Sequence, residues 1–164
     1  MKIKLAGWCL LLCLGWLPQN SWALCVGCTC SVTQADAIVF GNYQPFSSGD
    51  IDVTGTIRVY CFVTLGVTAS IDISLSRGSS GSYTPTRTML SGSNPLNYNL
   101  YTNSSRTTLW GDGSGGTSRI TRNFVLGLLG SITLTNIVYA RLPASQTTAA
   151  VGSYSDTITV TVDY

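Results

Sequence analysis

Apolar and polar residues alternate one by one along several stretches of this chain. In the clearest stretch, Val53, Ile57 and Val59 share one face of an extended chain, whereas Thr54 and Arg58 share the other. The same alternation recurs in residues 69–76, 96–101, 132–139 and 157–164. A period of two residues is that of a β-strand with one buried and one exposed face. The pattern therefore predicts half-buried strands and indicates no helix.

Short segments rich in Gly, Ser and Asn separate these runs, at residues 77–82, 91–95 and 111–116 and at Gly152. Such segments are typical of turns between strands. The abundance of Thr, Ser and Val, with no Glu, also favours strands over helices. Six to eight strands at this spacing predict an all-β fold, a β-sandwich of immunoglobulin-like type. We interpret residues 24–164 as one domain, because no linker or internal repeat divides them.

The first 23 residues have the features of a secretory signal peptide. Two lysines precede an apolar run at residues 5–17, and small residues stand where signal peptidase cleaves. The run is shorter than the roughly 20 residues that a membrane-spanning helix needs. We therefore predict a signal peptide at residues 1–23, cleavage between Ala23 and Leu24, and export of the remainder without a membrane span.

The exported part contains no Lys, Glu or His, and its seven arginines balance its seven aspartates. Histidine is the usual general base near neutral pH, and a serine nucleophile needs such a base. The common zinc and haem sites also lose their imidazole ligand. The composition therefore predicts a protein that is not an enzyme and has no metal or cofactor. The balanced charge argues against binding to nucleic acid.

Some local patterns have a functional and a plainer interpretation. Asp50 and Asp52 could serve acid–base chemistry or bind a cation, but a solvated turn is the plainer interpretation. Residues 110–116 could hold a phosphate or calcium, yet the segment lacks the Lys and the extra carboxylates that these ligands need, which favours a hairpin connection. Asn103 begins a glycosylation sequon. Packing is the expected use of the aromatic residues that could otherwise stack on a sugar, namely Tyr83, Tyr98, Tyr101, Trp110 and Tyr154.

Four cysteines remain after the signal peptide: Cys25, Cys28, Cys30 and Cys61. In an oxidising compartment they allow three disulfide pairings. One of these joins Cys30 to Cys61 across a long loop, worth roughly 3–4 kcal/mol by loop entropy, and leaves Cys25 with Cys28. The spacing of Cys25 and Cys28 also matches a redox or zinc motif, but no βαβ context or second pair accompanies it. We therefore expect structural disulfides, with the pairing open.

Four sequence blocks together resemble the spore coat protein U domain, which occurs in subunits of archaic chaperone–usher pili. The blocks are residues 30–32 with 39–45, residues 54–61, residues 96–102 with 106–113, and residues 140–144 with 152–162. They follow one another in order over nearly the whole exported chain. The resemblance implies a non-catalytic structural subunit of a secreted pilus for surface attachment and biofilm formation. The alternative is a self-contained secreted coat or binding module.

The resemblance also implies a structure and a set of partners. The sandwich would lack one strand, which a neighbouring pilus subunit supplies by donor-strand complementation. The partners would be a periplasmic chaperone, an outer-membrane usher and neighbouring subunits, with the protein passing through the periplasm to a surface pilus or the extracellular space. The family match of positions implies a disulfide between Cys30 and Cys61.

The C-terminal strand is the predicted contact surface for assembly. Its apolar row consists of Ile158, Val160, Val162 and Tyr164, which we expect to line the acceptor groove and to contact the chaperone. At the other end, few residues precede Cys30, which argues against an ordinary mid-fibre subunit and fits a tip or minor one. The apolar residues 124–129 fit either a core strand or an interface.

Overall fold

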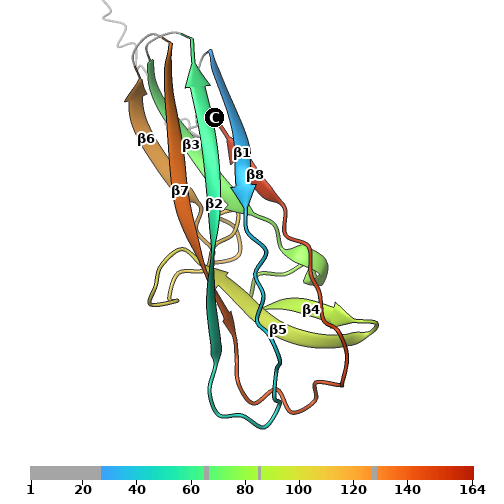
Figure 1. Ribbon diagram of the computed structural model, residues 1–164. Coiled ribbons are helices and arrows are strands. Elements are labelled where there is room, and N and C mark those ends of the chain that lie inside the picture. The colour runs from blue at the N-terminus through green and yellow to red at the C-terminus, as the bar shows by residue number, and fades with distance from the viewer. Residues whose placement is uncertain (1–26, 65–66, 85, 127–128) are drawn as a thin grey trace, which may run out of the picture.

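The computed structural model describes residues 27–64, 67–84, 86–126 and 129–164 (Figure 1). The strands are β1 (Cys28–Ala35), β2 (Ile51–Val63), β3 (Val67–Leu75), β4 (Arg87–Ser91), β5 (Asn94–Tyr101), β6 (Ile120–Leu126), β7 (Gly130–Leu142) and β8 (Val160–Asp163), with a short 3₁₀ turn, η1 (Gly78–Ser80), after β3. The predicted signal peptide, its cleavage site and Cys25 lie outside the described residues, so cleavage and the pairing of Cys25 with Cys28 stay predictions.

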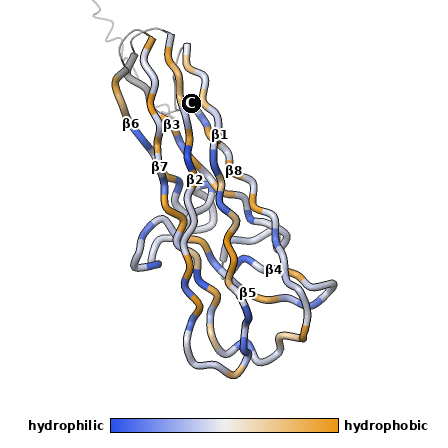
Figure 2. Tube along the Cα trace, viewed as in Figure 1, coloured by the Kyte–Doolittle hydropathy of each residue, from blue (hydrophilic) through white to orange (hydrophobic). Residues whose placement is uncertain are grey.

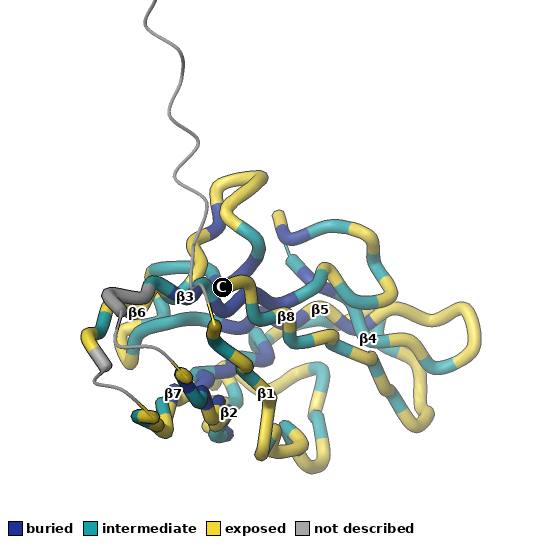
Figure 3. The backbone as a smooth tube through the Cα atoms, turned by 90° about the horizontal axis from the view of Figure 1, so that it is seen from above, coloured by how far each residue is buried: buried dark blue, intermediate teal, exposed yellow. Residues whose placement is uncertain are grey.

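The strands form two antiparallel sheets. One has the order β1-β2-β7-β5-β4 and the other the order β6-β3-β8. Strands β2 and β7 pair along their full lengths, whereas β5 joins β7 only through residues 99–101. Seen from above, β6, β3 and β8 form a layer over β7, β2 and β1 (Figure 3). The predicted all-β sandwich is confirmed.

The core lies between these layers and follows the predicted alternation. On β2, Ile57, Val59 and Cys61 are buried, whereas Arg58 and Tyr60 between them are exposed. Apolar and polar positions alternate along the strands in the same way in Figure 2. One face of each strand is thus removed from water, which is the main source of stability in such a sandwich.

The cross-strand disulfide ties the first strand to the second. Cys30 and Cys61 are register partners in the β1–β2 pair, with their Cα atoms 4.1 Å apart, and their sulfur atoms are bonded. Because β1 pairs only with β2 in its sheet, this bond fixes an edge strand. The bridge that the resemblance implies is therefore present.

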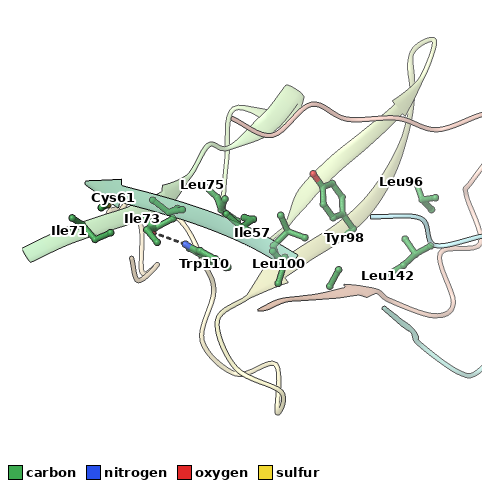
Figure 4. Close-up of a cluster of buried hydrophobic side chains, with 13 residues drawn as sticks. Ile57, Cys61, Ile71, Ile73, Leu75, Leu96, Tyr98, Leu100, Trp110 and Leu142 are labelled. Atoms are coloured by element: carbon green, nitrogen blue, oxygen red, sulfur yellow. Dashed lines mark hydrogen bonds between the residues drawn. The ribbon is translucent and has the colours of Figure 1, made fainter. Parts of the chain in front are cut away.

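Trp110 shows that the aromatic residues pack instead of forming an exposed platform. Its side chain is completely buried, and its indole Nε1 donates a hydrogen bond to the carbonyl of Ile73 at 2.9 Å (Figure 4). Tyr83 and Tyr98 are buried as well. The glycine-rich segment after Trp110 turns back, since the Gly111 amide bonds to Ser118. The bridge between Trp110 and Ser118 is parallel, so this segment is a loop and not the predicted hairpin connection.

A buried arginine lies beneath this region, where the sequence pattern gave no sign of one. Arg87 is fully buried; its Nε donates to the carbonyl of Ser76 at 3.1 Å, and its Nη2 donates to that of Trp110 at 2.5 Å. Its guanidinium lies over the ring of Tyr83. Asn99, expected on a polar face, is buried beside it because its side-chain oxygen accepts the Arg87 amide.

The aspartate pair is exposed, as expected, and Asp50 lies in the loop before β2, but Asp52 lies on the strand and both carboxylates form ion pairs. Asp52 lies on β2 directly opposite Arg141 on β7, and the two side chains form a bidentate ion pair at 2.8 Å. Arg106 lies 3.2 Å from the same carboxylate, and Asp50 lies 3.3 Å from Arg141. The hydrogen bonds from Arg141 hold the pKa of Asp52 below its ordinary value. These carboxylates therefore link strands and are poorly suited to acid–base chemistry.

Two further patterns are settled by local contacts. The side-chain oxygen of Asn103 accepts the amides of Thr107 and Thr108, so the sequon residue closes its own turn. In the apolar stretch 124–129, the first part belongs to β6, the edge strand of its sheet, where Phe124 packs on the core. The rest of that stretch is described only at its last residue.

Candidate assembly groove

A long groove opens between two segments that follow β1 and precede β8. It consists of two hollows of about 840 and 450 Å³. The hollows share Ile38, Phe40, Met89 and Tyr154, so they form one continuous depression. One wall comes from residues 35–45 and the other from residues 149–160. In Figure 1 the two segments descend together from the β1 and β8 side of the sandwich.

The first wall continues β1 but leaves its sheet. Pairing with β2 ends at Ala35, and the amide of Asp36 still bonds to the carbonyl of Thr56 at 3.0 Å. Among the described residues, the next four, 37–40, make no backbone–backbone hydrogen bond. Their side chains nevertheless alternate, with Ile38 packed on the core and Val39 73% exposed. This is a strand-like segment with an unpaired backbone.

The second wall is the C-terminal segment. Strand β8 pairs with β3 on one side, and its other edge has no strand partner in the described sheets. Of the predicted row, Ile158 and Val160 line the groove, whereas Val162 packs on the core and Tyr164 is 40% exposed outside the lining. Just before β8, the segment bonds to neighbouring loops and strands at isolated points, such as the paired backbone bonds of Ser155.

The floor of the groove is the hydrophobic core itself. Its buried residues are Ile57, Leu75, Leu96, Tyr98, Leu100, Val138 and Leu142. Phe40 reaches this floor, where its ring makes an edge contact with that of Tyr98 at 6.0 Å between centroids. On β1, Val32 is 39% exposed although its partner Val59 is completely buried. The core therefore reaches the surface along this side, as expected for a sandwich open between two edge strands.

The polar chemistry of the groove is sparse. Among the described residues that line the groove, only Asp36 and Asp156 are charged, and each already accepts hydrogen bonds. Burial and the hydrogen bond to Asp156 raise the pKa of the Tyr98 hydroxyl. In the described part of the chain, no three His, Cys, Asp or Glu residues come together as metal ligands. The groove thus presents mainly apolar side chains and, at residues 37–40, unpaired backbone.

Comparison with known families identifies the domain. The sequence profile of the Spore Coat Protein U domain matches residues 20–161, which is most of the chain. The chain belongs to the Spore Coat Protein U domain family. No match was found among curated proteins. None of the helices in the described residues is long and apolar enough to cross a membrane.

A solved structure shares the fold of this Spore Coat Protein U domain. It is the CsuC–CsuE chaperone–tip adhesion subunit pre-assembly complex from archaic chaperone–usher Csu pili of Acinetobacter baumannii. The TM-score is 0.56 at 23% sequence identity, and the match covers 84% of this chain and 40% of that chain. The present chain therefore spans less than half of the matched one. The likeness supports the predicted immunoglobulin-like fold.

One wall of the groove was not predicted from the sequence. The C-terminal row was expected there, but Phe40 was named only within a family block, and Ile38 was not singled out at all. Its alternation was obscured because Ala37 and Val39, on the exposed side, are apolar too. The polar residue of the second wall, Asp156, was not predicted either, because an aspartate interrupts the apolar alternation of that segment.

Proposed function

We propose that this chain is a non-catalytic structural subunit of a secreted chaperone–usher pilus, and that an added strand completes its sandwich. The observation that carries the proposal is the groove, whose floor is hydrophobic core and whose two walls present unpaired backbone. Membership of the Spore Coat Protein U domain family supports it. The shared fold with a chain of a chaperone–tip adhesion subunit complex supports it further.

Strand addition would satisfy both walls at once. An extended segment between residues 37–40 and β8 would pair its amides and carbonyls with theirs, as in β-augmentation. Its alternate side chains would enter the two hollows above Met89 and Tyr98 and remove the exposed core from water. A periplasmic chaperone supplies this strand first, and a neighbouring subunit replaces it after delivery to the outer-membrane usher.

The place of action follows from this role. The protein would be exported after cleavage between Ala23 and Leu24, pass through the periplasm and end in a surface pilus. A tip or minor position, with roles in attachment and biofilm formation, belongs to the same proposal. N-terminal sequencing of the exported protein tests the cleavage site: a first residue far from Leu24 would contradict it.

The test of the assembly role compares two faces of the C-terminal strand. Val160→Asp would place a charge among apolar groove contacts, at a cost of several kcal/mol, whereas Thr159→Asp changes the exposed face. We expect the tagged wild type and Thr159→Asp to co-purify from the periplasm with the chaperone in a defined complex and to enter fibres. Val160→Asp should do neither.

A self-contained coat or binding module would give the opposite result. The exported domain would then be purified without a chaperone, and its sandwich would need no added strand. Its groove-facing amides, including those of residues 37–40, would be protected from hydrogen exchange without any added strand. That outcome would overturn the assembly role.

A further inference from the structure

Asp156 stands in the apolar row of the second wall. Tyr154, Ile158 and Val160 occupy the alternate positions beside it, and all four residues are partly buried and line the smaller hollow. A carboxylate facing an apolar groove is costly unless hydrogen bonds compensate its lost hydration. The contacts of Asp156 therefore decide how this wall is held.

The carboxylate of Asp156 accepts hydrogen bonds from three separate places. Oδ1 accepts the backbone amide and the hydroxyl of Ser79 at 2.7 and 2.6 Å, together with the amide of Thr157 at 2.7 Å. Oδ2 accepts the hydroxyl of Tyr98, from the groove floor, at 2.6 Å. Hydrogen bonds to a charged group are stronger than neutral ones. We call this set of contacts the Asp156 latch.

The η1 turn leaves room for the carboxylate of Asp156. Gly78 begins η1 with a positive φ of 69°, and a Cβ atom there would lie 2.1 Å from Oδ2 of Asp156. A side chain at this position would therefore both strain the backbone and collide with the carboxylate. The absence of a side chain at Gly78 allows the close approach between the turn and the wall.

We propose that Asp156 is a positioning residue for strand addition. The latch holds residues 153–159 extended along the groove, with Tyr154 and Ile158 turned inward, before any partner strand arrives. This inference rests on the proposed function. Tyr154 and Ile158 pack on the core from one side, but their groove side is unfilled without the partner. Apart from the latch, the segment is held by backbone bonds of Ser155 with Leu90 and by bonds of Thr159 with Ser76. The latch supplies polar contacts that do not depend on that partner.

The latch affects the affinity for an added strand by setting the fraction of free molecules whose second wall is already in the binding position. If only a fraction of the free protein holds its wall correctly, the apparent Kd rises as the inverse of that fraction. Replacing the carboxylate by an amide weakens or loses several charge-assisted bonds at once. We expect Asp156→Asn to bind a complementing strand about tenfold more weakly or worse, with a smaller loss for Ser79→Ala.

The experiment measures binding of one defined probe to the purified exported chain. The probe is a fluorescein-labelled synthetic peptide of about ten alternating valine and threonine residues, long enough to form a strand. Anisotropy gives its Kd for the wild type, Asp156→Asn, Ser79→Ala and Tyr98→Phe. Asp52→Asn is the matched control, because Asp52 also accepts charge-assisted bonds but lies outside the groove lining. Hydrogen exchange of residues 153–159 without peptide is the second readout.

Support would consist of weaker peptide binding and faster exchange of residues 153–159 in Asp156→Asn, with both unchanged in Asp52→Asn. Equal Kd values for the wild type and Asp156→Asn would overturn the latch and leave the proposed function standing. Failure of the wild type to bind the peptide would overturn both. If Asp156→Asn does not fold, Ser79→Ala and Tyr98→Phe decide: an unchanged Kd in both overturns the latch.

Discussion

Removal of the Cys30–Cys61 disulfide should lower the free energy of unfolding by about 3.7 kcal/mol. The two residues are 31 apart in sequence, and the chain-entropy relation for a loop of that length gives this value at 25 °C. The perturbation is the double variant Cys30→Ala, Cys61→Ala. Because Cys61 is completely buried, loss of its sulfur atom also removes packing contacts, which lowers the free energy of unfolding slightly further.

Urea unfolding of the purified exported domain measures the effect. With a urea m-value of about 2 kcal/mol/M, the expected loss moves the midpoint down by about 2 M. Dithiothreitol added to the double variant is the control, since any further loss then comes from the remaining cysteines. A loss below about 1 kcal/mol would refute the reasoning, because it would show that the bridge does not restrict the unfolded chain.

Three further results are expected. Trp110→Phe should lower the free energy of unfolding by about 1–3 kcal/mol, because the buried carbonyl of Ile73 loses its donor; thermal or urea unfolding measures it, and no change would contradict that hydrogen bond. Asp52→Asn should cost less than about 1 kcal/mol, since its ion pair is partly exposed. The pKa of Asp52 is lower in the folded protein, so its ion pair contributes fully to the free energy of unfolding above the ordinary aspartate pKa of about 3.9. This contribution is lost as the pH falls through the folded pKa. The urea unfolding curves of the wild type and Asp52→Asn should therefore converge in acid. Gly78→Ala should destabilise the domain and speed hydrogen exchange around Asp156, whereas Gly81→Ala, at a similar φ but with open space around it, should leave that exchange unchanged.

Strands β2, β3, β5 and β7 were predictable from their alternation because their environment is regular, whereas β1, β4 and β6 were not among the alternating runs. Along β2 every second side chain enters the same core, so a period of two appears directly in the sequence. The same reasoning placed Ile158 and Val160 on an inward face. It could not show that this face is open, because a half-buried position has the same residue types whether another strand covers it or water does.

The polar interior was beyond this reasoning for a different reason. Arg87 is buried because the carbonyls of Ser76 and Trp110 and the ring of Tyr83 surround its guanidinium. Asp156 faces the groove because a turn and Tyr98 supply its donors. Such sites form where particular segments meet in the folded protein, and no local pattern in the sequence shows which segments will meet.

The cross-strand bond at Cys30 also has a mechanical consequence. Cys30 is the third residue of β1, so a pull on the chain before it reaches the disulfide after only two strand residues. The tension then passes covalently to Cys61 near the end of β2, and β2 is paired with β7 along its whole length. The backbone hydrogen bonds that residues 31–35 make with β2 then carry little of this tension. In a fibre under flow, the groove wall that continues from β1 would thus keep its shape while the chain ahead of it is stretched.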